Sequence, residues 1–388
     1  MALLVVILAG PGCAGRKTGD STAASTDPHA TTEAASPAPP PRSDHPVSRE
    51  PFLSQVRVFA GGKGHVSDVA FSPGGDRLAV ASDETVDVFD VATGRRLATA
   101  PDGAIRLTFT SDGKVLAVES SQGAFAAYRI PAPPAGEPPA ALEPVKEAQA
   151  LALSSLGALA AAPGLPVLAV AISGNSPKVV FVNTSTWKAD RETLIQSLPP
   201  GSGFNPQSVR FSPDGAYLAL DGIVEDPDKK FEGYVAVWAD GGAKFLQLKK
   251  LGGFFGQVAG NTLLFLNPTP QSPRNLQLLV ASHEGLDNGY GSLIQFFRLP
   301  DLTYMSELKD EDIRGVNSVA LPAPAQNRIL GIQWDVDYVY VWDIGRGEVT
   351  EWIPSPHLLT EALATTSDGA WAATGQADGS VVLWRVRS

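Results

Sequence analysis

Short runs in which apolar and polar residues alternate, separated by turn residues, make up most of the chain after residue 50. At the C-terminal end these runs are residues 361–365, 370–374 and 380–386, with S-D-G and A-D-G turns between them. Alternation with a period of two is typical of a half-buried β-strand, and short turns of this kind join antiparallel neighbours. The pattern therefore predicts a three-stranded antiparallel meander.

The same arrangement recurs along the chain, and seven such units can be distinguished. A bulky or β-branched residue near the end of the third strand marks each unit, at Phe89, Tyr128, Val182, Trp238, Phe297, Trp342 and Trp384. The shortest interval is 39 residues (89 to 128) and the longest is 59 (238 to 297), which is close to the period of propeller blades. We expect the third unit to begin with a strand at residues 148–154. The Pro/Ala-rich insert 131–144 should bypass or loosen the outer strand of the second unit.

The two ends of this repeat region complement each other. The last unit stops after its third strand and lacks an outer strand, whereas the alternating run 52–59 precedes the first unit and lacks a sheet. A single blade is apolar on both faces, so blades are stable only when they stack around an axis and the ring closes. We therefore expect residues 51–388 to form an all-β, seven-bladed β-propeller in which the strand 52–59 completes the last blade.

Two units carry the motif of a known repeat family. The first has Gly64-His65, F-S-P-G-G-D at 71–76 and V-D-V-F-D at 86–90, and it resembles a WD repeat. The last unit resembles one more closely. The resemblance implies a hydrogen-bonded set of His, Ser or Thr, Asp and Trp inside a blade, which is complete in the last unit and partial in the first, where Phe89 replaces the Trp. The residues are His357, Thr374, Asp378 and Trp384, and then His65, Ser82 and Asp83. This structural role explains them without a catalytic triad.

The N-terminus has the features of an export signal. Residues 2–10 form an apolar run of nine residues, which is shorter than the roughly 20 needed to span a bilayer but suits the core of a signal peptide. Small residues and then Cys13 follow, which resembles a bacterial lipoprotein signal, although Gly10 stands where that family prefers an aliphatic residue. We expect a signal peptide over residues 1–13 that ends at a lipidated Cys13. A non-lipidated secretory signal, or an apolar start without a targeting role, are the alternatives.

Residues 14–50 are rich in Ala, Ser, Thr and Pro and contain no aromatic residue. Such a composition buries too little apolar area to offset the entropy lost on ordering, so we expect a disordered tether. The tether would hold the propeller off a membrane. The implied location is the cell envelope, as an outer-membrane-anchored lipoprotein that is periplasmic or surface-exposed, or otherwise a secreted protein.

The charge and the residue counts argue against several classes of partner and site. The net charge of −11 disfavours nucleic acid as a partner, because phosphate binding needs a basic face. With one cysteine, the chain has no internal disulfide and no cysteine-built metal site. Of the five histidines only His283 is outside the tether and the WD-repeat sets, and one histidine does not make a metal site. We expect no catalytic residues, no metal and no cofactor.

Two long loops between the second and third strands of the fourth and fifth units are the candidate binding region, at residues 221–233 and 283–291. In propellers these loops share one face, so the two should lie side by side. Their polar and aromatic residues could form a ligand or protein contact, with calcium as one option. The alternative is two solvated loops that differ only in length. The residues are Glu225, Asp226, Asp228, Lys229 and Phe231, and then His283, Glu284, Asp287, Asn288 and Tyr290.

Taken together, these features predict a monomeric, non-enzymatic scaffold that binds an unidentified protein partner, since WD-repeat propellers mostly bind proteins. Fold alone does not determine function, and two alternatives stay open. One is a propeller enzyme or small-molecule binder, such as a lactonase-like hydrolase, that uses the axial pocket. The other is an envelope assembly factor. An enzyme should bring several His, Asp, Glu or Asn side chains to one mouth of the channel, whereas a scaffold should expose an apolar and aromatic patch.

Overall fold

The computed structural model describes residues 50–387, apart from 63, 132, 135, 226–230, 252–261, 267–275, 287–288, 311–312, 314–315, 323–326, 334–336 and 356–359; of residues 282–293 only the backbone is described. The chain divides into two compact units, Met1–Asp44 and His45–Ser388, and all of the described residues belong to the second. Among the described residues no helix has both the length and the apolar character needed to cross a membrane.

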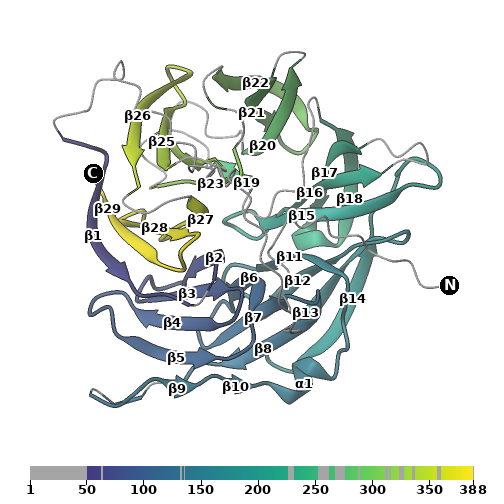
Figure 1. The fold of residues 1–388 in the computed structure, drawn as a ribbon. Coiled ribbons are helices and arrows are strands. Elements are labelled where there is room, and N and C mark those ends of the chain that lie inside the picture. The colour runs from purple at the N-terminus through teal and green to yellow at the C-terminus, as the bar shows by residue number, and fades with distance from the viewer. Residues whose placement is uncertain are drawn as a thin grey trace, which may run out of the picture. The chain divides into compact units, whose positions relative to one another are not determined.

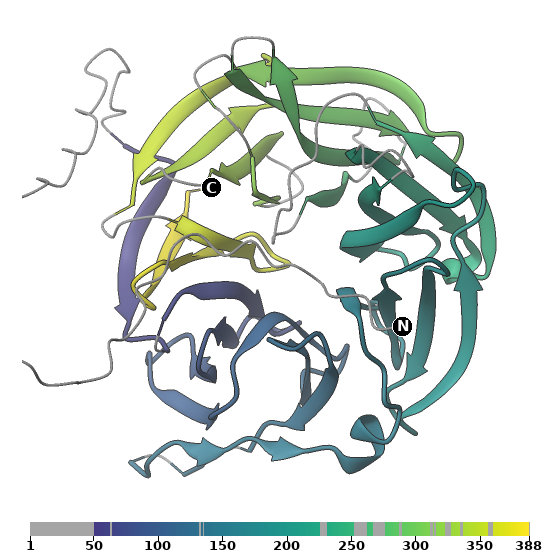
Figure 2. The same ribbon diagram turned by 45° about the vertical axis from the view of Figure 1, so that its right-hand side comes forward.

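Seven sheets, each built on an antiparallel meander, stand around a common axis, as expected (Figure 1, Figure 2). The four strands of each blade are called a to d, from the innermost strand at the axis to the outermost strand at the rim. Blade one has β2 (Val66–Phe71), β3 (Arg77–Ser82), β4 (Val86–Asp90) and β5 (Arg96–Ala100), and blade two has β6 (Ala104–Phe109), β7 (Val115–Ser120), β8 (Phe125–Arg129) and β10 (Glu143–Pro144). Blade three has β11 (Leu156–Ala161), β12 (Val167–Ile172), β13 (Lys178–Asn183) and β14 (Lys188–Leu194), and blade four has β15 (Gly203–Phe211), β16 (Leu218–Glu225), β17 (Phe231–Ala239) and β18 (Lys244–Lys250), with a 3-10 turn η1 (Asp240–Gly242) before β18.

Blade five has β19 (Leu263–Leu266), β20 (Gln277–Leu286), β21 (Gly289–Arg298) and β22 (Thr303–Asp310), and blade six has β23 (Ser318–Ala320), β24 (Arg328–Ile332), β25 (Tyr338–Asp343) and β26 (Glu348–Pro354). Blade seven has β27 (Thr360–Thr365), β28 (Trp371–Gln376), β29 (Val381–Val386) and, as its outer strand, β1 (Leu53–Phe59). The remaining elements are β9 (Ala140–Ala141) and α1 (Lys146–Gln149).

Burial explains why the middle strands are apolar almost throughout. The four central residues of β12 and of β13 are all buried, because each blade is covered on both faces by its neighbours. The outer strand β14 is exposed along nearly its whole length. Each hydrophobic cluster joins two adjacent blades; the cluster around Trp238, for example, combines blade four with Ala169 and Phe181 of blade three.

The ring closes as expected, because β1 pairs antiparallel with β29 from Leu53↔Val386 to Phe59↔Val381. Leu53 and Phe59 are 1% and 2% exposed. The backbone N–H of Phe52 donates to the Glu351 carboxylate on blade six, at 2.7 Å. Closure therefore combines ladder hydrogen bonds with apolar burial across two blade interfaces.

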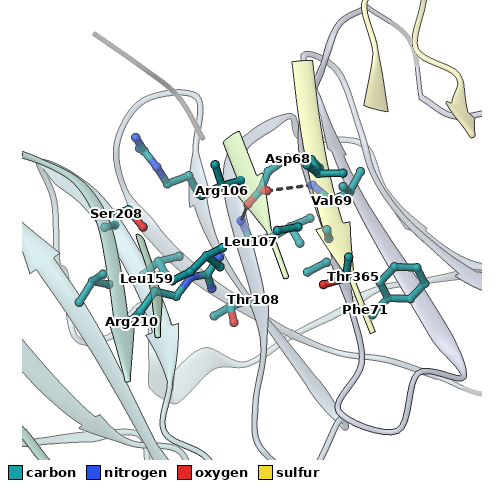
Figure 3. A pocket seen from close by; sticks show the side chains of 18 of the residues that line it. Asp68, Val69, Phe71, Arg106, Leu107, Thr108, Leu159, Ser208, Arg210 and Thr365 are labelled. Carbon is teal, nitrogen blue, oxygen red and sulfur yellow. Dashed lines mark hydrogen bonds between the residues drawn. The ribbon is translucent and has the colours of Figure 1, made fainter. Parts of the chain in front are cut away.

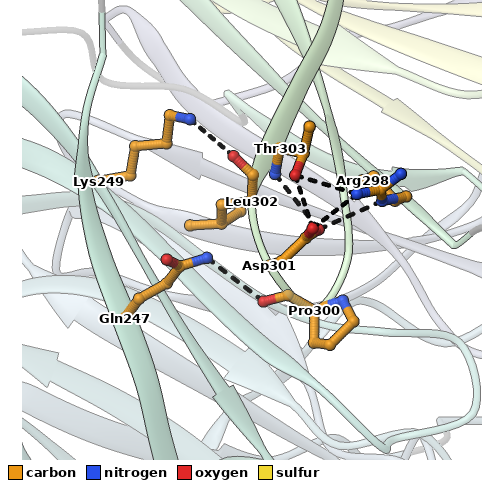
Figure 4. Close-up of polar contacts among 7 residues, drawn as sticks. All are labelled: Gln247, Lys249, Arg298, Pro300, Asp301, Leu302 and Thr303. Carbon is orange, nitrogen blue, oxygen red and sulfur yellow. Dashed lines mark hydrogen bonds and ion pairs between the residues drawn. The ribbon is translucent and has the colours of Figure 1, made fainter.

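Polar contacts at the rim also join neighbouring blades, as Figure 4 shows for blades four and five. The Lys249 ammonium on β18 donates to the backbone oxygen of Leu302 at 2.7 Å, in the turn between β21 and β22. Within that turn the Asp301 carboxylate pairs with Arg298 at 2.7 Å and accepts from the Thr303 hydroxyl at 2.6 Å. The turn is thereby a fixed docking point for the outer strand of blade four.

The prediction of a strand at residues 148–154 was wrong. These residues include the end of α1 and the loop after it, and the inner strand of blade three is β11, Leu156–Ala161. Ala148, Leu151 and Leu153 instead pack into the cluster between blades two and three. The alternation of apolar residues that predicted a strand therefore belongs to a helical turn and a loop whose apolar side chains are buried. The inner strand itself has a nearly continuous apolar sequence, as expected for a strand buried on both faces.

The insert 131–144 does more than loosen blade two. Ala140 and Ala141 pair in parallel with β5, so the insert adds a fifth strand to blade one. Leu142 is buried, and β10 then pairs with β8 as an outer strand of only two residues. The Arg95 guanidinium holds the start of the insert through the backbone oxygens of Pro133 and Pro134. The insert therefore covers one exposed sheet edge before it completes the next.

Candidate functional site

The innermost strands of the blades enclose an axial cavity of about 430 Å³ (Figure 3). Much of its wall is apolar and comes from different blades, including Leu107, Leu159, Phe265 and Leu363. Three charged residues also line it: Asp68 on β2, Arg106 on β6 and Arg210 on β15. The cavity thus combines apolar walls with a small number of charges, which is the usual composition of a small-molecule site.

Asp68 links blade one to blade two. Its carboxylate accepts hydrogen bonds from the backbone N–H of Val69 at 2.9 Å and of Leu107 at 3.0 Å, drawn in Figure 3. Burial raises the pKa of Asp68 to about 6, and the hydrogen bond from Leu107 and the nearby Arg210 guanidinium partly oppose that rise. The carboxylate therefore serves first as a link between blades.

Arg106 is paired inside its own blade. Its guanidinium lies 2.9 Å from the carboxylate of Glu119 on β7, which is 3% exposed. Burial raises the pKa of Glu119, and the positive charge of Arg106 opposes the rise. Arg106 is thus paired with a carboxylate that lies behind the cavity wall.

Asp221 on β16 links blade four to blade five. It is 1% exposed and accepts hydrogen bonds from the Ser208 N–H at 2.8 Å and the Thr262 hydroxyl at 2.5 Å. Burial raises its pKa to about 7, and these two hydrogen bonds lower it only partly. A carboxylate that is hard to ionise therefore lies directly beside the inner strand β15.

Arg210 differs from these residues because its guanidinium has no hydrogen-bonding partner among the residues that the structure describes. Burial lowers the pKa of Arg210, and the carboxylates of Asp68 and Asp221 act from nearby to raise it. Arginine stays charged under such shifts, since its unperturbed pKa is above 12. The cavity wall thus carries a cation with unused donors.

The arrangement favours binding over acid–base chemistry. In the described part of the cavity lining Asp68 is the one carboxylate, and both of its oxygens accept backbone hydrogen bonds. Within the described ranges no three His, Cys, Asp or Glu side chains are grouped so as to hold a metal ion. The several converging acid–base side chains expected of an enzyme are therefore not assembled by these residues.

The two predicted loops are largely β-hairpins, which corrects that part of the expectation. In blade four, strand pairing continues past Asp221↔Val235 to Glu225↔Phe231. Ile223 and Val224 are buried, whereas Phe231 is 47% exposed and Glu225 is exposed. Asp226, Asp228 and Lys229 lie outside the described residues.

In blade five the pairing of β20 with β21 continues to Leu286↔Gly289. His283, Glu284 and Tyr290 are therefore strand residues, of which the backbone alone is described, and Asp287 and Asn288 are outside the described ranges. The segment that looked like a loop is thus mostly the end of a ten-residue strand pair.

The WD-repeat residues of blade seven form a buried polar group. The Trp384 indole N–H donates to the Thr374 hydroxyl at 2.9 Å, and the Gln376 amide donates to the same oxygen at 3.0 Å. Asp378 accepts from the backbone and hydroxyl of Ser380 in the turn. His357, like Cys13, is outside the described ranges.

Blade one differs from the pattern that the resemblance implied. The His65 backbone N–H donates to Asp83 at 3.0 Å, but the His65 ring lies 2.9 Å from the carboxylate of Glu361 on blade seven. The Ser82 hydroxyl donates to the backbone oxygen of Thr85. The His65 side chain therefore joins the first blade to the last, while its backbone contacts Asp83 in its own blade.

Sequence reasoning did not single out the charged residues of the cavity. A signal was present: Asp68, Arg106 and Arg210 each lie in the first strand of a unit, the strand nearest the axis. A charge on that strand has little access to bulk solvent once the ring closes. Comparing first strands between units would have found these residues.

Comparison with known proteins agrees with the fold. The family model described as WD domain, G-beta repeat matches residues 53–90, from β1 through β4, and residues 361–385 in blade seven. None of the curated proteins matches the chain. The matched segments lie in the two blades that meet where the ring closes. Two segments of the chain thus match the WD40 repeat, and the chain folds as a seven-bladed β-propeller.

Proposed function

We propose that the protein is a non-enzymatic scaffold whose partner protein contacts the β16–β17 and β20–β21 hairpins. WD40 propellers generally bind protein partners. In blade one, the pairing of the second strand with the third continues for three residue pairs beyond Leu78↔Phe89, to Ala81↔Val86. The same pairing continues for seven residue pairs beyond Leu218↔Trp238 in blade four, and for eight beyond Leu278↔Phe297 in blade five.

Relative to blade one, the paired strands are longer by four residue pairs in blade four and by five in blade five. At about 3.3 Å per residue, these extensions are roughly 13 and 17 Å long. Both hairpins extend from the same end of strand b, so they extend from the same face of the ring. This extension is the observation that carries the proposal. Packed residues such as Val224 support the hairpin, and Phe231 offers an exposed aromatic ring on it.

Replacing Phe231 with Asp should reduce partner recovery at least tenfold in crosslinking pull-downs from the native cells, because aromatic residues dominate binding energy at interfaces. The matched control is Leu165→Asp, which changes a similarly exposed apolar side chain in the turn between β11 and β12, at the opposite end of strand b, and should leave recovery unchanged. Equal loss in both variants, or full recovery with Phe231→Asp, would contradict the proposed face.

We further propose that the scaffold is held in the bacterial cell envelope by a lipid on Cys13, with residues 14–50 as the tether. Support comes from the apolar run before the cysteine and from its being the one cysteine of the chain. In its narrower form the proposal is an envelope assembly factor, whose partner would be an outer-membrane protein.

Changing Cys13 to Ser should move the protein from the membrane fraction to the soluble fraction, because the acyl chains would be lost. Ser21→Ala in the tether is the control and should leave the protein with the membranes. Membrane association of the Cys13→Ser protein at the wild-type level would rule out the lipid anchor.

A further inference from the structure

We propose that the axial cavity binds a small organic carboxylate, whose anionic group is held by Arg210 while its apolar body contacts the cavity walls. This site is separate from the hairpin face of the proposed scaffold function. It would give the propeller a ligand at its centre, whatever protein binds at the hairpins.

The state of Arg210 is the first argument. A guanidinium carries five N–H donors in a planar fork that matches a carboxylate. The two carboxyl groups that act on Arg210 are those of Asp68 and Asp221. Their oxygens accept hydrogen bonds from the Val69, Leu107 and Ser208 backbones and the Thr262 hydroxyl. No described residue accepts from Arg210, so its donors are open to a ligand in the cavity that it lines.

The charges around the cavity favour an anion over a cation. Arg210 has open N–H donors in it, whereas both oxygens of Asp68, the one carboxylate in the described lining, already accept backbone hydrogen bonds. Glu119 balances Arg106, but its carboxylate is not among the lining groups. Because the surroundings are partly desolvated, a direct pair between Arg210 and a ligand would be stronger than the same pair in water.

The walls indicate what the rest of the ligand is like. Leu107, Leu159, Phe265 and Leu363 are among the apolar residues of the lining. Thr108 and Ser208 add hydroxyl groups to it (Figure 3). A volume of about 430 Å³ is within the range of ligand pockets. These walls suit an aromatic or aliphatic carboxylate better than a fully hydrated anion such as inorganic phosphate.

Calorimetry on the full-length protein at pH 6.5, with benzoate, hexanoate, benzamide and inorganic phosphate as probes, tests the proposal. We expect benzoate or hexanoate to bind, and benzamide, the neutral isostere of benzoate, to bind at least tenfold more weakly. Arg210→Gln should lower the affinity for the carboxylate at least tenfold. The matched control, Arg191→Gln, changes an arginine that lies over the Phe181 ring at the rim and should leave the affinity unchanged.

A second variant, Thr108→Trp, keeps Arg210 and places a large side chain at a half-buried position of the cavity lining, and it should abolish binding even if Arg210→Gln does not fold. The proposal is overturned if neither carboxylate binds, if benzamide binds as tightly as benzoate, or if phosphate alone binds. Unchanged affinity in Thr108→Trp, or in a folded Arg210→Gln protein, would overturn it as well.

Discussion

A chain that begins at residue 60, and so lacks β1, is expected not to unfold as a cooperative unit, whereas a chain that begins at residue 50 is expected to melt like the whole protein. The physical reason is that β1 supplies the outer strand of blade seven and buries Phe52, Leu53 and Phe59. Each such side chain contributes about 1.5–3 kcal/mol, and the sum approaches the roughly 5–15 kcal/mol that stabilises a typical domain.

Thermal and urea unfolding, followed by circular dichroism, measure this effect. Two point variants in β1 provide a graded test on the intact chain. Leu53→Ala should cost about 2–4 kcal/mol, since Leu53 is 1% exposed, whereas Val56→Ser should cost little, since Val56 is 50% exposed. A cooperative melt of the chain that starts at residue 60, at the wild-type temperature, would show that the ring does not depend on this strand.

Replacing Asp221 with Asn should remove most of a decline in stability that the wild-type protein shows between pH 5 and pH 8. Burial raises the pKa of the Asp221 carboxyl to about 7 in the folded protein, against about 4 in the unfolded chain. Between these values the folded state binds more protons, so the free energy of unfolding falls as pH rises. The difference of about three pKa units corresponds to about 4 kcal/mol over the whole titration, as an upper bound, and about two-thirds of this falls between pH 5 and pH 8.

The substitution preserves the hydrogen bonds, because an Asn oxygen can accept from the Ser208 N–H while its NH₂ donates to the Thr262 hydroxyl. Asp68, whose pKa is also raised, keeps a smaller slope of the same sign. Asp301→Asn is the control: Arg298 holds the pKa of that carboxyl well below its usual range, so it does not titrate between pH 5 and 8. Urea unfolding at each pH gives the slopes, and equal slopes for wild type and Asp221→Asn would contradict the assignment.

Two different kinds of contact hold the blades together, one at the outer edge of the ring and one near its axis. Closure by β1 stabilises the ring at its outer edge, where apolar side chains pack between the last blades. The buried carboxylate Asp221 ties blade four to blade five near the axis, and above pH 7 its ionised form destabilises the fold. The strand behind the inner wall therefore carries a charge that stability alone does not favour.

The hairpins show where local pattern stops being informative. The segments 221–233 and 283–291 contain Gly, Asp and Lys or Asn, which favour loops on composition. In blade four the deciding contact comes from a third strand: β15 starts at Gly203 and pairs through Phe204↔Val224, so the β16 extension has an apolar partner. That partner is far along the chain, and no local rule contains it.

The sequence by itself determined the repeated three-strand unit, the count of seven and the closure by residues 52–59. These follow from period-two burial, from turn residues, and from the need to pair an unfinished sheet edge. Only the tertiary structure decided that Asp68, Arg106 and Arg210 share one cavity. They lie 38 and 104 residues apart along the chain (68 to 106, 106 to 210). An alternating strand looks the same whether its polar face meets solvent or the axis, and the closed ring alone distinguishes the two.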